Sequence, residues 1–206
     1  MNPSPDQLYR ECGFVLVAGL VDAATVAACR DHLERIEGAA DGHMWAVGPG
    51  GDAFLDGVAG DARLAGLARA LLGRAPVPFG YTYFQKPAGT GLAARWHQDG
   101  HPWRTQLGVT SAVTLWIALD PTGADNGALV FLPGSHTRPA QPLVAHDGPS
   151  MFGVEMATGP ADGSQAVTVG MDPGDVCAHH PDVVHSSGPN RSTGTRRALA
   201  LRYRSP

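Results

Sequence analysis

Glycine and proline are frequent enough in this chain to restrict its choice of fold. The sequence holds 27 Gly and 17 Pro among 206 residues, while 43% of its residues are hydrophobic. That hydrophobic fraction is too high for a disordered chain. Because Gly and Pro interrupt helices and strands, long helical bundles are disfavoured, and short strands joined by turns are favoured. The sequence therefore predicts a mainly β or α+β fold, and its length suits a single domain over 1–206.

Charge and cysteine content restrict the partners and the compartment. Lys and Arg number 15 against 19 Asp and Glu, and no basic run precedes the Arg-rich C-terminal strand, so we expect no nucleic-acid partner. The apolar stretches fall well short of the ~18 residues that span a membrane, and the N-terminus lacks a signal-peptide layout. Three cysteines without CxxC spacing are typical of free thiols in a reducing compartment. We expect a cytoplasmic protein, either a monomer or a homodimer.

Hydrophobic periodicity divides the chain into a helical segment, about 1–75, and a β core, about 76–206. Helices are expected at 6–12, after Asp22, and from Asp61 to Gly73, with a short strand at 14–17. Strands are expected at 79–85, 112–119, 128–132, 175–179, around 183–185 and at 196–203. The Gly-rich stretch 38–60 and the polar stretch 137–170 are predicted to be long loops beside the site.

Residue types that bind metals occur in two motifs of the β core. His97 and Asp99 are two residues apart in the run WHQDG, so in an extended segment both side chains project to one side. His185 would complete a triad of two histidines and one carboxylate, which leaves three positions open and is used by non-haem Fe(II) oxygenases. A hydrogen-bonded turn for His97 and Asp99, and a core position for His185, are the alternatives.

Arg196 lies eleven residues after His185 and begins the last predicted strand. Its neighbours on the same face are Ala198 and Ala200, so a guanidinium there can bind the distal carboxylate of a diacid with room for the carbon chain. A metal triad beside such an arginine describes a pocket for 2-oxoglutarate. The adjacent Arg197 faces the opposite way, so one of the two arginines is expected in a surface salt bridge. The spacing favours Arg196 as the pocket residue, with Arg197 and Arg191 as the alternatives.

Six ordered motifs and the N-terminal layout together carry a resemblance. They are WHQDG (96–100), TLWIALD (114–120), NGAL (126–129), PGSH (133–136), GD (174–175) and HSSGPNRSTGTRR (185–197), preceded by GFVLVAGL (13–20). The chain resembles the phytanoyl-CoA dioxygenase family of Fe(II)/2-oxoglutarate-dependent oxygenases. The resemblance implies a double-stranded β-helix, a cupin-like jelly roll with N-terminal helices packed on one sheet. It also implies that His97, Asp99 and His185 bind Fe(II), and that Arg196 binds 2-oxoglutarate.

The implied activity is hydroxylation or another oxidation of a small molecule with O2, in natural-product biosynthesis or small-metabolite metabolism. Desaturation and oxidative cyclisation stay open, whereas Asp99 argues against halogenation because related halogenases lack this carboxylate. Two other classes remain. One is a cupin-type metalloenzyme that uses no 2-oxoglutarate, and the other is a non-catalytic jelly-roll binding module.

Further contacts follow from strand alternation and from the predicted loops. Gln85 and Thr114 are expected to line the cavity near the cosubstrate, and Lys86 to point away. Trp116 shares the face of Thr114, and a position as a core aromatic is its alternative. Substrate contacts are expected from loop residues, for each of which ordinary loop packing is the alternative: His43, Trp45, His101, Trp103, Arg104, Met151 and Phe152.

Overall fold

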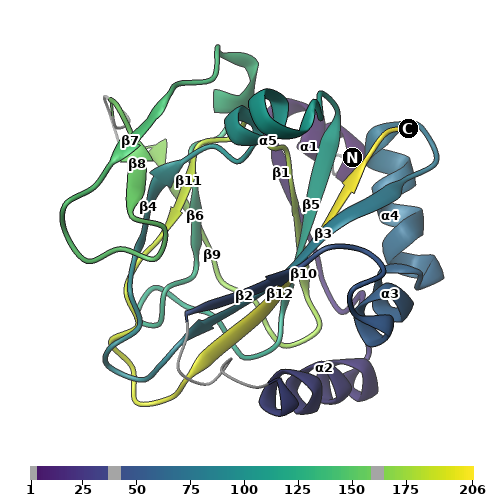
Figure 1. Cartoon of the computed structure of the whole chain (residues 1–206), viewed down its shortest axis with the longest axis horizontal. Helices are drawn as coiled ribbons and strands as arrows, with labels where there is room; N and C mark the ends of the chain where they lie inside the picture. The colour runs from purple at the N-terminus through teal and green to yellow at the C-terminus, as the bar shows by residue number, and fades with distance from the viewer. Residues whose placement is uncertain (1–3, 37–42, 159–164) are drawn as a thin grey trace.

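Two antiparallel sheets face each other, and most helices cover the outside of the larger one (Figure 1). The computed structural model describes residues 4–36, 43–158 and 165–206. The larger sheet has the order β1-β10-β5-β12-β3-β2. Its strands are β1 (Phe14–Val17), β2 (Met44–Val47), β3 (Val77–Lys86), β5 (Ala112–Ala118), β10 (Val176–His179) and β12 (Arg196–Arg204). Strands that are far apart in the sequence thus lie side by side, as expected for a jelly roll.

The smaller sheet carries His97 and His185 of the two motifs that are predicted to bind a metal, and a separate hairpin lies beside it. Its order is β4-β11-β6-β9, formed by β4 (Ala94–His97), β6 (Leu129–Phe131), β9 (Val167–Val169) and β11 (His185–Ser187). The hairpin pairs β7 (Leu143–Ala145) with β8 (Val154–Met156). This architecture confirms the predicted double-stranded β-helix core.

The helices begin where capping side chains occur. Asp22 accepts a hydrogen bond from the backbone of Thr25 at 2.8 Å and starts α2 (Ala23–Arg35), as predicted. Asp61 likewise starts α4 (Ala62–Leu72), and Gly73 ends it in the left-handed conformation at φ 69°. The remaining helices are α1 (Pro5–Cys12), α3 (Ala53–Ala59), α5 (Gly100–Leu107) and the short 3-10 turn η1 (Ser135–Thr137).

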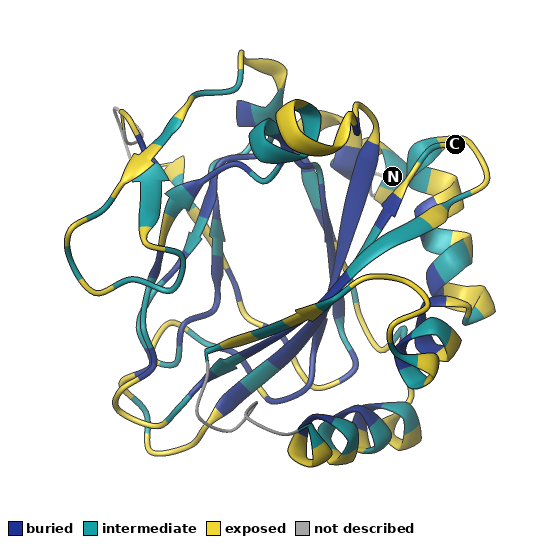
Figure 2. Ribbon diagram, in the orientation of Figure 1, coloured by how far each residue is buried: buried dark blue, intermediate teal, exposed yellow. Residues whose placement is uncertain are grey.

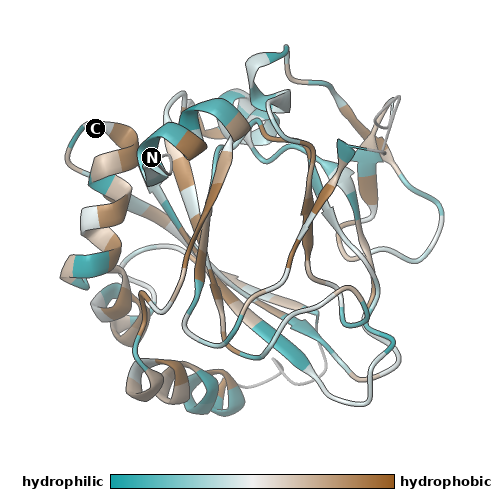
Figure 3. Cartoon of the chain, turned by 180° about the vertical axis from the view of Figure 1, so that it is seen from behind, coloured by the Kyte–Doolittle hydropathy of each residue, from teal (hydrophilic) through white to brown (hydrophobic). Residues whose placement is uncertain are grey.

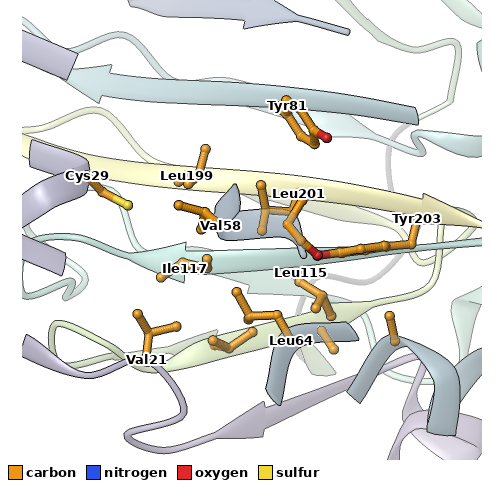
Figure 4. Close-up of a cluster of buried hydrophobic side chains, with 14 of the residues drawn as sticks. Val21, Cys29, Val58, Leu64, Tyr81, Leu115, Ile117, Leu199, Leu201 and Tyr203 are labelled. Atoms are coloured by element: carbon orange, nitrogen blue, oxygen red, sulfur yellow. The ribbon is translucent and has the colours of Figure 1, made fainter. Parts of the chain in front are cut away.

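The main hydrophobic core lies between the larger sheet and helices α2, α3 and α4. Figure 4 shows Leu115 and Ile117 of β5 with Leu199 and Leu201 of β12, close to Leu64 of α4. Strands β5 and β12 are buried along most of their length (Figure 2), and hydrophobic residues follow the central strands (Figure 3). Burial of these apolar side chains against the helices is the main stabilising contribution, at ~1.5–3 kcal/mol for each large side chain.

The opposite face of the larger sheet points into the space between the two sheets. A second, smaller core there includes Trp116 and Ala118 of β5, and Ala198 and Ala200 of β12. The predicted alternation of residues 112–119 is therefore confirmed. Because the two faces alternate, one strand supplies both the folding core and the inner cavity.

The two predicted long loops contain regular structure. The stretch 38–60 includes β2 and α3, with residues 37–42 outside the described ranges, and the stretch 137–170 includes β7, β8 and β9, with 159–164 outside them. Strand β2 exists because it pairs with β3, from Met44 opposite Phe84 to Val47 opposite Tyr81, and such long-range pairing leaves no local signal. Among the described residues, no helix combines the length and hydropathy needed to cross a bilayer.

Candidate active site

His97 and His185 face each other across the ladder of β4 and β11. The Nδ1 atom of His97 lies 2.6 Å from the carbonyl of Arg95, and that of His185 lies 3.0 Å from the carbonyl of Val183. When Nδ1 donates its proton to a carbonyl, Nε2 keeps a free lone pair and the ring orientation is fixed. Both histidines are therefore held in the form in which they bind a metal.

Asp99 completes the group from the turn after β4. One ligand atom from each of His97, Asp99 and His185 can be chosen so that all lie within 4.8 Å of one another. Asp99 Oδ1 is 3.7 Å from His97 Nε2. The segment is extended only as far as His97, because Asp99 has helical dihedral angles at the start of α5. Its side chain makes no capping hydrogen bond there, so the carboxylate is available to a metal.

The charges of the triad suit a divalent cation. Burial lowers the pKa of His97 and of His185 to about 4, so both rings are neutral near pH 7. Burial by itself raises the pKa of Asp99, but its interactions with His179, His185 and His97 and the charge of Arg202 lower the pKa overall. Two neutral imidazoles and one ionised carboxylate are the ligand set of a non-haem Fe(II) centre.

A cavity of about 220 Å³ between the sheets contains the triad. Thr114 and Trp116 line it from β5, as predicted. Trp103 of α5 lines it, and so do Met151 and Phe152 from the loop between β7 and β8. The Phe152 ring meets the rings of His97 and Phe84 edge-on, with centroids 5.1 and 6.2 Å away. The hairpin loop therefore covers the triad with an apolar side chain.

Arg196 enters the same cavity from β12. One guanidinium nitrogen donates to the carbonyl of Gly127 at 2.8 Å, and the guanidinium carbon lies 5.3 Å from the centre of the Trp116 ring. Within the described part of the chain, no carboxylate pairs with Arg196, and its Nε has no hydrogen-bond partner. Burial lowers the pKa of this guanidinium to about 10, yet it stays charged near neutral pH. A buried, unpaired cation of this kind fits an anionic ligand.

The expectation for Gln85 was wrong, because the alternation of β3 is the reverse of the one assumed. Arg196 pairs directly with Lys86, which puts Lys86 on the inner face and Gln85 on the helix-facing side with Tyr83. Lys86 still does not line the cavity, since its ammonium donates to the carbonyls of Leu92 and Gly188 at 2.5 and 2.6 Å. Burial, with the charge of Arg196, lowers its pKa to about 7.

Four of the residues expected to contact substrate do not line the cavity. Trp45 pairs with Tyr83 and packs against the core beneath the helices, and the ring of His43 lies 3.4 Å from the backbone carbonyl of Gln85. His101 and Arg104 lie on α5 but outside the cavity lining, and Arg104 makes two hydrogen bonds to Asp182 at 2.8 Å. Because α5 is a helix, these two side chains point away from the cavity. The sequence predicted a loop here, so this orientation was not expected.

Three residues at the site were not expected from the sequence. His179 lies 3.6 Å from Asp99 through Nε2, and Arg202 lines the cavity from β12. Gln98 donates to the carbonyl of Asp182 at 2.6 Å and accepts from the backbone of Gln141 at 2.9 Å. It thereby links the metal motif to the chain before β7. Strand alternation carried past Ala200 would have revealed Arg202, since residues two apart share a face.

The model of the Phytanoyl-CoA dioxygenase (PhyH) family matches residues 9–198, which include all three triad residues and Arg196. This chain belongs to the phytanoyl-CoA dioxygenase family. Among family relatives, peroxisomal phytanoyl-CoA dioxygenase of Bos taurus is 37% identical over 114 residues, 52% of this chain and 32% of the bovine protein. L-proline trans-4-hydroxylase of Streptomyces griseoviridis is 30% identical over 170 residues, 68% of this chain and 59% of the hydroxylase. The matches thus span between a third and three fifths of these relatives.

A solved structure has a similar fold. SnoN, a non-heme alpha ketoglutarate dependent epimerase from nogalamycin biosynthesis, has a TM-score of 0.75 and 26% identity to this chain. The similarity covers 98% of this chain and 82% of SnoN. The fold of this phytanoyl-CoA dioxygenase family member is therefore similar over nearly its whole length to that of a 2-oxoglutarate-dependent enzyme.

Proposed function

We propose that this protein is an Fe(II)- and 2-oxoglutarate-dependent dioxygenase that oxidises a small molecule. The observation that carries this proposal is the triad of His97, Asp99 and His185 in one cavity with the unpaired guanidinium of Arg196. Membership of the phytanoyl-CoA dioxygenase family supports it. A cupin-type enzyme without 2-oxoglutarate, or a binding module without catalysis, has no use for that guanidinium.

Different side chains bind the metal and the cosubstrate. His97 and His185 bind Fe(II) through Nε2, and Asp99 binds it through its carboxylate. Arg196 holds the distal carboxylate of 2-oxoglutarate, while Ala198 and Ala200 leave room for its carbon chain. When bound, Fe(II) would use 2-oxoglutarate and O2 to oxidise a C–H bond of the substrate, with release of succinate and CO2. Phe152 covers the triad and excludes water.

The presence of Asp99 supports oxygenation over halogenation. Among the oxidations that this chemistry allows, we propose hydroxylation first, and desaturation and cyclisation as the alternatives. Proline hydroxylation by one relative, and the natural-product context of SnoN, support a small metabolite as the substrate. A cytoplasmic location is consistent with the three free cysteines. The monomeric or dimeric state stays a prediction, as does the absence of a nucleic-acid partner.

Anaerobic addition of Fe(II) and 2-oxoglutarate to the metal-free protein tests the proposal. We expect the weak visible charge-transfer band of the chelate, and slow succinate formation once O2 is admitted. Asp99→Ala and His185→Ala should abolish the band, whereas His101→Ala, changed on α5 outside the cavity, should keep it. If the wild-type protein gives neither band nor succinate, the proposed function is wrong.

A further inference from the structure

A second arginine of β12 faces the cavity that holds Arg196. Arg202 is on the same face of the strand as Ala198 and Ala200, and it lines the cavity. One of its guanidinium nitrogens donates to the hydroxyl of Thr82 at 2.5 Å, and its guanidinium carbon lies 5.6 Å from the centre of the Trp103 ring. The stack on Trp103 and the bond to Thr82 fix the guanidinium in one orientation.

Arg202 differs from most arginines near the site because it lacks an acidic partner. Arg104 pairs with Asp182 at 2.8 Å, and Arg197 pairs with Asp120 at 2.9 Å. For Arg202, no carboxylate of the described residues lies within pairing distance, and its Nε has no hydrogen-bond partner among them. The residue is half-buried, with its Nε atom buried, and the carboxylate that acts on its charge without a direct ion pair is Asp99 of the triad. With Asp99 engaged by a metal, a bound ligand is needed to supply the counter-charge of Arg202.

The neighbours of Arg202 lead directly to the metal ligands. Arg202 pairs across the ladder with Thr114, and Thr114 pairs with His179, so these three side chains form one row on the inner face of the sheet. The Thr114 hydroxyl has no hydrogen-bond partner within the described chain. His179, at the end of the row, lies 3.6 Å from Asp99. A ligand held by Arg202 and Thr114 is therefore close to the triad.

Arg202 cannot serve the same carboxylate as Arg196. Six residues of a strand separate their Cα atoms by about 20 Å, at ~3.3 Å per residue. The guanidinium of Arg196 lies over Trp116, whereas that of Arg202 lies over Trp103, on α5. With Fe(II) and 2-oxoglutarate bound, the charges of the metal and Arg196 are balanced by Asp99 and the dianionic cosubstrate. The positive charge of Arg202 is then not balanced by any of these groups.

We propose that Arg202, assisted by Thr114, binds a carboxylate of the substrate, so that the protein oxidises a small carboxylic acid. This rests on the proposed function and names its substrate class. The planar fork of a guanidinium matches a carboxylate. The apolar body of the acid would lie against Phe152 and Trp103, which line the same cavity. Held in this way, the carboxylate end is fixed at β12 and the carbon skeleton is directed toward the triad.

Benzoate and benzamide provide a matched pair of probes, because they share size and shape and differ in charge. Protein loaded anaerobically with Fe(II) and 2-oxoglutarate is titrated with each probe by calorimetry, and the visible band is recorded in the same samples. We expect wild-type protein to bind benzoate at least about 10-fold more tightly than benzamide, and Arg202→Met to weaken benzoate binding by about 10- to 100-fold. Benzamide binding should change little.

Two variants control for folding and for charge. Arg202→Lys keeps a cation and should retain part of the preference for benzoate. Arg197→Met removes an arginine from the opposite face of the same strand, where Arg30 still pairs with Asp120, and should bind both probes as wild type does. Affinity for 2-oxoglutarate, measured from the band, should fall in Arg196→Met and not in Arg202→Met.

Three outcomes overturn the assignment, and a fourth refutes the function on which it rests. Wild-type protein that forms the band but does not prefer benzoate leaves the dioxygenase proposal standing and refutes the substrate class. Unchanged benzoate binding in Arg202→Met or, should that variant not fold, in Arg202→Gln refutes the role of Arg202. A loss of 2-oxoglutarate affinity in Arg202→Met, with none in Arg196→Met, means that the two arginines have exchanged roles. Absence of the band in wild type refutes the proposed function itself.

Discussion

His97 and His185 are direct cross-strand partners, and the centroids of their imidazole rings lie 4.1 Å apart. Both rings are buried, which is the main reason that the pKa of each is lowered to about 4. The pair therefore stays neutral over a pH range in which an ordinary histidine takes up a proton. A metal can bind to the two Nε2 atoms without first displacing protons.

The lowered histidine pKa values predict how the metal-free protein responds to acid. Between pH 7 and pH 5 the unfolded chain protonates these histidines and the folded chain does not, so the free energy of unfolding should fall as pH falls. Each histidine should contribute about 1–2 kcal/mol to this loss. Urea unfolding in the presence of a chelator at both pH values measures it. His185→Gln should reduce this loss of unfolding free energy between pH 7 and pH 5, and His101→Gln should not. Equal losses in the two variants would contradict a lowered pKa of His185.

Arg196 is predicted to determine the affinity for 2-oxoglutarate. Arg196→Met should raise the dissociation constant about 10- to 100-fold, because a charge-assisted bidentate contact is lost. Arg197→Met should leave that constant unchanged, since Arg197 faces the helices and pairs with Asp120 and Glu34. Titration of the anaerobic Fe(II) protein with 2-oxoglutarate gives both values. A change in Arg197→Met alone would show that the other arginine binds the cosubstrate.

Gly100 is predicted to be needed for the placement of Asp99. A Cβ atom at position 100 would lie 2.3 Å from Asp182 Oδ1 and 2.9 Å from a guanidinium nitrogen of Arg104, so Gly100→Ala must displace this ion pair. We expect a loss of about 1–3 kcal/mol in the free energy of unfolding, together with weaker Fe(II) binding.

Gly66→Ala in α4 is the matched control for that change. A Cβ at position 66 meets nothing within 4 Å, so the substitution should stabilise the protein by about 0.5–1 kcal/mol and leave Fe(II) binding unchanged. Thermal unfolding and Fe(II) titration of both variants make the comparison. Similar effects of the two substitutions would argue against a specific role for Gly100.

Phe152 is predicted to protect the metal centre from unproductive reaction. Phe152→Ala removes the ring that meets His97 edge-on and should admit water and O2. We expect succinate formation without substrate to rise several-fold, while the free energy of unfolding falls by about 1 kcal/mol. Val144→Ala, at an exposed position of the same hairpin, should change neither quantity. An unchanged rate in Phe152→Ala would assign the covering role to another side chain.

Elements with a strong local signal could be predicted from the sequence. The capping residues Asp22 and Asp61 mark helix starts through hydrogen bonds to residues two or three positions away. Alternation along 112–119 identifies both faces of β5 because burial on each face selects different side chains. The triad and Arg196 could be located because their motifs keep a fixed order and spacing, and the structure brings all four residues into one cavity.

Features that depend on distant partners could not be predicted in this way. Strand β2 forms by pairing with β3, and the inner face of β3 is set by the pairing of Lys86 with Arg196. A shift of one residue reverses every side chain of a strand, which is why Gln85 was placed on the wrong side. Trp45 was expected in a loop because β2 was not anticipated. The helix that follows Asp99 was missed because Gly100 and Pro102 suggest a loop, although Pro is tolerated in a first helical turn.

The division of the larger sheet into two faces separates what this protein must preserve from what it can change. Along β3, β5 and β12, even-numbered residues point into the space between the sheets, where Thr114, Trp116 and Arg202 line the cavity, and odd-numbered residues such as Leu115 and Leu201 face the helices. Selection for a new substrate can thus act on one set of positions while the folding core stays intact. Such independence is a physical basis for evolvability, and it defines in advance the positions at which a directed-evolution library should be varied.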